Sequence, residues 1–152
     1  MEKRVVVLIH MGLPYRKTIK YANERARALG AKVTLLGIVP EFNHRSRVAL
    51  AMHESAPHDV LIGRMEREVE AFFEMAIQFS LDLGITVDTR IERGEIEEVL
   101  KRTAKDAYTK LIVVPAPTKH DQHMPFLDTI RQFAHNMLDC DLSCPVVSVL
   151  AT

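Results

Sequence analysis

Short apolar runs rich in β-branched residues alternate along this chain with segments of helical periodicity. The runs cover residues 5–9, 33–39, 111–114 and 146–150. Strands that are apolar on both sides are typical of parallel sheets covered by helices on both faces. The alternation therefore predicts an α/β fold, a doubly wound parallel sheet whose strands are joined through right-handed helical crossovers.

Four segments between and after these runs have the apolar spacing of amphipathic helices. They cover residues 15–29, 61–83, 95–104 and 125–138. Gly30 and Gly84 follow the first two, as glycine commonly follows the last residue of a helix. In the third helix, Glu97 and Lys101, and likewise Glu98 and Arg102, are spaced to form supporting ion pairs. In the second helix, the stripe predicted to face the core consists of Leu61, Met65, Val69, Phe72, Ala76, Phe79 and Leu83.

Residues 85–92 alternate between apolar and polar side chains, unlike the other runs. A strand with one polar face is expected at the edge of a sheet. We therefore predict five strands in the order 3-2-1-4-5, with helices on both faces and this third strand at one edge. Residues 1–152 form one domain in this interpretation, and residues 41–58 are either a mobile flap or contain a short extra helix.

The charge balance, the length of the first apolar run and the cysteine content limit the classes of function open to this chain. Lys plus Arg and Asp plus Glu both number 20, so no net charge draws the protein to nucleic acid or to an acidic membrane. The opening apolar run has only five residues, too few for a signal-peptide core or a membrane span, so we expect a cytoplasmic protein. Cys140 and Cys144 are interpreted as partly buried thiols, with a redox pair as the alternative.

Three segments together resemble the universal stress protein family. Residues 93–115 read RGEIEEVLKRTAKDAYTKLIVVP, in which a glycine precedes an aliphatic helix and a strand follows. The family's last strand begins with a Cys-Pro-Val sequence, which is similar to Cys144, Pro145, Val146 and Val147 here. The segment Arg4–Ile9 is similar to the family's first strand. Two rival folds fit less well. A phospho-receiver domain requires paired acidic residues after the first strand, and a pyrophosphatase-type ATP enzyme requires a Ser-Gly-Gly-rich turn there. This chain has His10, Met11 and Gly12 at that position instead.

Ligands of doubly wound sheets bind at the carboxyl ends of the strands, where the strand order reverses. The candidate crevice consists of His10, Met11, Gly12, Ile38, Val39, Pro115, Ala116, Pro117, Thr118 and Lys119. The resemblance implies that ATP-binding relatives carry an acid after the first strand, an adenine-binding stretch after the second and a glycine-rich phosphate loop after the fourth. In this chain His10 stands in place of the acid, and no glycine follows Gly94 that could form the phosphate loop. Pro115 and Pro117 also lack the N–H groups that would donate to a phosphate. We therefore expect no cofactor and no ATP binding in the family's usual manner.

The leading functional interpretation is a non-enzymatic, homodimeric stress-response or regulatory module that acts through protein contacts. The dimer is expected through the last strand, whose apolar residues lack a protecting lysine. Those residues are Val146, Val147, Val149 and Leu150.

Two alternatives stay open at this point. The first is an adenine-nucleotide-binding switch with a divergent phosphate site. The second is a hydrolase or metal-dependent enzyme that uses His10, His120 and His123. The spacing of the histidines matches no specific metal motif, and no G-x-S-x-G turn marks a nucleophile. We therefore predict neither a bound metal nor catalytic residues.

Overall fold

The computed structural model describes residues 2–10, 13–39, 58–116 and 144–150. Its elements are β1 (Arg4–Ile9), α1 (Arg16–Leu29), β2 (Lys32–Val39), α3 (His58–Asp82), β3 (Val87–Arg93), α4 (Ile96–Lys105), β4 (Thr109–Ala116) and β5 (Val146–Leu150). The strands form one parallel sheet in the order β3-β2-β1-β4-β5. The predicted fold class, strand order and edge position of β3 are confirmed. The helix expected at 125–138 and the stretch at 41–57 lie outside the described residues.

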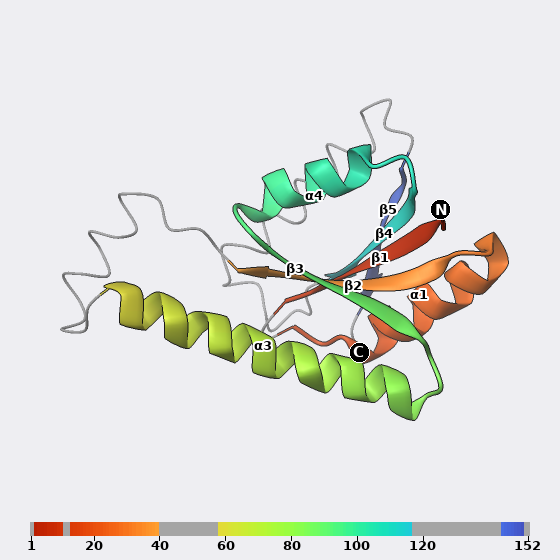
Figure 1. The fold of residues 1–152 in the computed structure, drawn as a ribbon. Coiled ribbons are helices and arrows are strands. Elements are labelled where there is room, and N and C mark those ends of the chain that lie inside the picture. The colour runs from red at the N-terminus through yellow and green to blue at the C-terminus, as the bar shows by residue number, and fades with distance from the viewer. Residues whose placement is uncertain (1, 11–12, 40–57, 117–143, 151–152) are drawn as a thin grey trace.

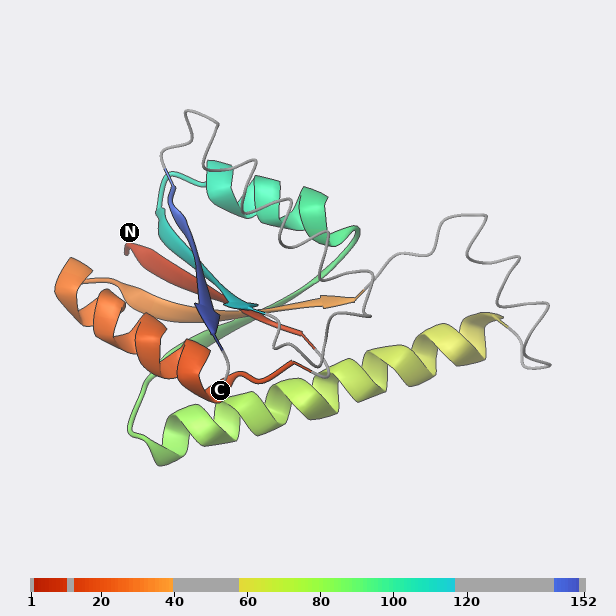
Figure 2. The ribbon, with the colours of Figure 1, turned by 180° about the vertical axis from the view of Figure 1, so that it is seen from behind.

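The described helices cover both faces of the sheet. α1 and α3 lie on one face and α4 lies on the other, as the two opposite views show (Figures 1 and 2). This arrangement follows from the right-handed crossovers of a sheet whose order reverses at its first strand. None of the helices in the described ranges has both the length and the apolar composition needed to cross a membrane.

β1 supplies side chains to both layers of the core. Val5, Val7 and Ile9 pack with the residues of α1 and α3, whereas Val6 and Leu8 pack with those of α4. None of the five is more than 3% exposed. Successive residues of a strand point to opposite faces, so a strand covered on both sides must be apolar throughout. This burial explains the unbroken first run of the sequence.

α1 and α3 end in the same backbone motif. Gly30 and Gly84 follow the two helices with φ values of 63° and 73°, a left-handed conformation that glycine adopts without steric cost. The N–H of Ala31 then donates to the carbonyl of Ala26 at 2.8 Å, and the N–H of Ile85 donates to that of Ser80 at 2.9 Å. The predicted glycine stops are confirmed, and each turns the chain back toward the sheet.

The buried face of α3 differs from the predicted stripe. Phe73 and Ser80 are buried, whereas Leu83 is 45% exposed. Phe72 and Phe79 are only partly buried and instead lie edge-on against Tyr15 at the start of α1, with ring centroids 5.4 and 5.8 Å away. α3 packs against α1 as well as the sheet, so its apolar surface is shared between two neighbours. The buried hydroxyl of Ser80 is tolerated because it donates to the carbonyl of Ala76 at 2.9 Å.

The predicted ion pairs of α4 are only half correct. Lys101 lies 3.1 Å from Glu97, one helical turn before it, as expected. Arg102 does not pair with Glu98. Its guanidinium lies 3.6 Å from Glu92 on β3, so a contact between elements replaces the contact within the helix.

Gly37 allows α3 to approach β2 closely. A Cβ atom at this position would lie 3.1 Å from Cδ2 and 3.2 Å from Cε2 of Phe73. The ring of Phe73 is 3% exposed and surrounded by the core, so it has little room to move away. The absence of a side chain at residue 37 therefore sets the depth at which Phe73 packs.

We expect Gly37→Ala to lower the free energy of unfolding by roughly 1–3 kcal/mol, since it overpacks the core against Phe73. Gly63→Ala is the matched control, because Gly63 lies in α3 with nothing within 4 Å of an added Cβ. The control should be neutral or stabilising by up to about 1 kcal/mol. Urea unfolding measures both variants, and equal effects at the two positions would contradict the close packing.

Candidate functional site

The candidate crevice lies at the carboxyl ends of the central strands. β1 and β4 are neighbours, and the strand order reverses between them. Of the predicted crevice residues, His10 directly follows β1, Ile38 and Val39 end β2, and Pro115 and Ala116 end β4. These described members therefore lie together at one end of the sheet, where the strands finish. The others, namely Met11, Gly12, Pro117, Thr118 and Lys119, lie outside the described residues.

A small apolar cavity of about 60 Å³ lies at this end of the sheet, under α3. It is lined by Ile9, His10, Ile38, Met65, Val69, Phe72 and Phe73. An apolar cavity of about 150 Å³ holds one benzene molecule. The cavity here has less than half that volume, so an adenine ring would enter only if side chains of α3 moved aside.

The four α3 residues that line the cavity were missed by the sequence analysis of the site. Met65, Val69, Phe72 and Phe73 are spaced so that they lie on one side of the helix. A helix after the second strand was predicted. However, the sequence contains no signal for how far along its length α3 meets the end of β1.

Of the described residues that line the cavity, His10 is the titratable one. Its carbonyl accepts a hydrogen bond from the N–H of Leu13 at 3.0 Å. Leu13 is 2% exposed, so this bond ties His10 to a residue anchored in the core. The backbone thus holds His10, which is partly buried, at the mouth of the crevice.

Pro115 removes one backbone hydrogen-bond donor from the described end of β4. Pro115 is buried and occupies the strand position opposite Val149 of β5. Proline has no N–H group, so this position cannot contribute a backbone donor at the crevice. A phosphate-binding turn depends on several such donors pointing inward.

The thiol of Cys144 has low reactivity in the folded protein. It is 1% exposed and packs in the core under α4, and its thiol lies 3.7 Å from the carbonyl of Pro145. Burial raises the pKa of the thiol to about 11, because the thiolate would lose its hydration, and the positive charge of Lys110 offsets this only in part. The thiolate is the form that attacks substrates and binds metals, so Cys144 is poorly suited to either role. Cys140 lies outside the described residues.

A metal centre has no support in the described part of the chain. No group of three or more His, Cys, Asp and Glu side chains there is arranged to hold a metal ion. His120 and His123 lie outside the described residues.

The chain was compared with family models, curated proteins and solved structures. No family model matches it, and no curated protein matches it. Solved structures match along nearly its whole length. A protein of the universal stress protein family from Burkholderia pseudomallei is 16% identical, with 96% of each chain covered and a TM-score of 0.62. UspA from Lactobacillus plantarum is 15% identical, with 98% of this chain and 99% of that chain covered and a TM-score of 0.64.

A universal stress protein from Archaeoglobus fulgidus, solved in complex with dAMP, is 14% identical, with 97% of each chain covered and a TM-score of 0.59. At these identities the likeness establishes the fold. The chain has the fold of universal stress proteins along nearly its whole length.

The burial of Cys144 leads to a prediction about its reactivity. With a pKa near 11 instead of 9.0, the thiolate fraction at pH 8 is about 100-fold lower. In the Cys140→Ser variant we expect Cys144 to react with a disulfide reagent at least about 100 times more slowly than glutathione does. In 8 M urea the difference should disappear. Reaction of the folded variant as fast as glutathione would contradict the buried, neutral thiol.

Proposed function

We propose that this chain is a cytoplasmic universal stress protein, a non-enzymatic homodimeric module for stress response or regulation that does not bind ATP in the manner of its nucleotide-binding relatives. The fold shared with universal stress proteins along nearly the whole chain supports the family. The single observation that carries the functional part is the small, apolar cavity at the strand ends.

A triphosphate would be poorly held at this site. Its several negative charges require inward N–H donors, a helix N-terminus or well-placed cations. Among the described residues, the cavity lining is apolar apart from His10, and Pro115 lacks a donor where β4 ends. The sequence adds that no glycine follows Gly94, so a glycine-rich phosphate loop is absent.

The non-enzymatic assignment is supported by the state of Cys144 in the described part of the chain. The Cys144 thiol is buried and its pKa is raised, which removes the nucleophile most easily activated. We therefore propose that the output of the protein passes through its surfaces rather than through turnover of a substrate.

An adenine-nucleotide-binding switch is the second candidate. The Archaeoglobus fulgidus neighbour was solved with dAMP, so this fold does hold an adenine nucleotide in one protein. In the present chain, Ile38 lies beside an apolar cavity that a flexible Met65 side chain helps to close. Outward movement of that side chain would enlarge the cavity and permit weak binding of the adenine ring alone.

Titration calorimetry with adenosine, AMP and ATP plus magnesium tests whether the phosphates contribute to binding. We expect similar millimolar affinities for all three, because the phosphates add little binding energy at this site. Val69→Leu, which adds a methylene group to the cavity lining, should weaken adenosine binding. Met75→Leu is the control, because Met75 lies on α3 with 60% exposure outside the cavity. Micromolar binding of ATP would overturn the proposal and favour the nucleotide switch.

The homodimer is supported by the backbone of β5. The N–H of Ile112 donates to the carbonyl of Pro145 at 3.1 Å. Alternate residues of a strand in a parallel ladder bond to the same neighbour, so residues 145, 147 and 149 bond toward β4. Residues 146, 148 and 150 direct their N–H and C=O groups to the open edge. A second copy of β5 would satisfy these groups.

The valine side chains of β5 belong largely to the protein's own core. Val146 is 8% exposed in the layer under α4, and Val147 and Val149 pack against the opposite layer. A lysine at any of these positions would therefore disturb the fold together with the edge. A test of the dimer must change the backbone of the edge instead.

We expect Ser148→Pro to give a folded monomer, because it removes a donor that points to the open edge and spares the ladder with β4. Val147→Pro is the matched control and should unfold the protein, since residue 147 donates toward β4. Light scattering gives the mass, and circular dichroism reports folding. A folded Ser148→Pro variant that is still dimeric would exclude β5 as the interface.

A further inference from the structure

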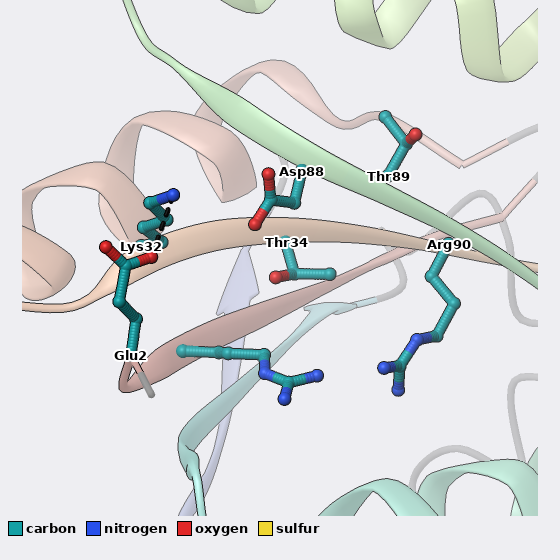
Figure 3. Close-up of a pocket in the computed structure, with 7 residues that line it drawn as sticks. Glu2, Lys32, Thr34, Asp88, Thr89 and Arg90 are labelled. Atoms are coloured by element: carbon teal, nitrogen blue, oxygen red, sulfur yellow. Dashed lines mark ion pairs between the residues drawn. The ribbon is translucent and has the colours of Figure 1, made fainter.

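A polar pocket of about 260 Å³ lies at the opposite end of the sheet from the crevice. It is lined by Glu2, Arg4, Lys32, Thr34, Asp88, Thr89 and Arg90 (Figure 3). Arg4 and Lys32 are the first residues of β1 and β2, so the pocket lies toward the amino ends of the strands. Its volume exceeds the roughly 150 Å³ that holds benzene, so a ligand the size of a six-membered ring fits.

Strand register gathers these side chains around Thr34. In the parallel pairing, Arg4 lies beside Lys32, and Thr34 lies beside Asp88. Residues two apart along a strand share a face, so these four and Arg90 all project from the side of the sheet that α4 covers farther along. Figure 3 shows Thr34 and Arg90 on this side, with Thr89 projecting away from it.

The hydroxyl of Thr34 is the distinctive feature of the pocket. Thr34 is 4% exposed, and its Oγ1 is the one buried side-chain polar atom in the described ranges without a hydrogen-bond partner. The buried hydroxyls of Ser80 and Thr103 donate to carbonyls one helical turn earlier. A strand offers no such carbonyl, because its own ladder uses the backbone groups. A buried hydroxyl without a partner is unfavourable, so a group that enters the pocket gains by bonding to it.

The charges around Thr34 are divided between an acidic and a basic end. At the acidic end Lys32 lies 2.7 Å from Glu2, and the hydrogen bond to Glu2 together with the charges of Glu2 and Asp88 raises the pKa of the lysine. In Figure 3 its ammonium group lies between these two carboxylates. The single positive charge of Lys32 is thereby matched, and the Asp88 carboxylate is still able to accept hydrogen bonds.

The basic end consists of two arginines with donors to spare. Arg4 lies 3.6 Å from Asp106, and Arg90 lies 3.7 Å from Glu92. Both ion pairs are longer than a hydrogen bond, and each guanidinium carries five N–H donors. Arg4 comes from β1 and Arg90 from β3, the strands on either side of β2, so the two residues flank Thr34. Two guanidinium groups in this arrangement favour an oxyanion, which accepts several N–H donors at once.

We propose that this pocket binds a small hydroxylated anion of the sugar-phosphate class. The phosphate lies between Arg4 and Arg90, a sugar hydroxyl bonds to Thr34, and a further hydroxyl donates to Asp88. The site lies at the opposite end of the sheet from the crevice. This proposal therefore does not depend on nucleotide binding at the crevice or on the function proposed above.

Three probes test the ligand class: glucose 6-phosphate, glucose and inorganic phosphate. Amide chemical shifts of the ¹⁵N-labelled full chain are followed during titration. We expect glucose 6-phosphate to bind at least tenfold more tightly than either fragment and to shift the amides of Thr34 and Asp88. Equal affinity for phosphate would overturn the sugar-phosphate assignment. No shifts, or shifts confined to Ile9 and Val39 at the crevice, would overturn the site.

Thr34→Val tests the hydroxyl, because valine keeps the shape of threonine and removes the unpartnered group. The melting temperature of the free variant should be equal to or above that of the parent protein, and its affinity for glucose 6-phosphate should fall at least tenfold. A lower melting temperature would mean that the hydroxyl already has a partner in the free protein, which would overturn the proposal.

Arg90→Gln tests the basic end and should weaken glucose 6-phosphate at least tenfold while leaving glucose unaffected. Lys20→Gln is the charge-matched control, because Lys20 is exposed on α1, on the other face of the sheet. Equal losses in these two variants would show attraction by net charge alone and would exclude a built site.

Discussion

The burial of β1 on both faces is the constraint on which the rest of the structure depends. Its five apolar residues tie the layer under α1 and α3 to the layer under α4, so neither layer can shift without the other. Both neighbours of β1 take their register from it, with Arg4 beside Lys32 on β2 and Thr109 on β4. The reversal of strand order therefore falls beside a strand that is buried on both faces, and the crevice after Ile9 has a rigid floor.

The two ends of the sheet differ in chemistry because β2 changes character along its length. On the α4 side its first half carries Lys32 and Thr34, whereas its second half carries Leu36 and Ile38. On the other side, the bare backbone at Gly37 lets the ring of Phe73 close over the carboxyl end of the strand. One end is therefore dry and nearly filled, and the other is charged and open enough to take a polar ligand.

The two edges of the sheet are handled differently as well. β3 carries Asp88, Arg90, Glu92 and Arg93, and such charges discourage pairing with another strand. β5 has no charged residue, and its outward backbone groups are available to a second copy. Since unrelated functions occur on this fold, these surfaces and the two pockets distinguish the chain from others that share its architecture.

The sequence by itself determined the elements and their order, because periods of 2 and 3.6 residues and glycine stops such as Gly30 are local signals. The edge position of β3, the apolar character of β1 and the missing donors at Pro115 could be predicted in the same way. Only the tertiary structure decided which side of α3 is buried, that Arg102 pairs with Glu92, and that Met65 and Phe72 close the crevice. The pocket around Thr34 had no sequence signal, since its residues come from three strands separated by more than 20 positions. Contacts of that kind depend on strand register and on the depth of helix packing, which are set by the whole core rather than by any one segment.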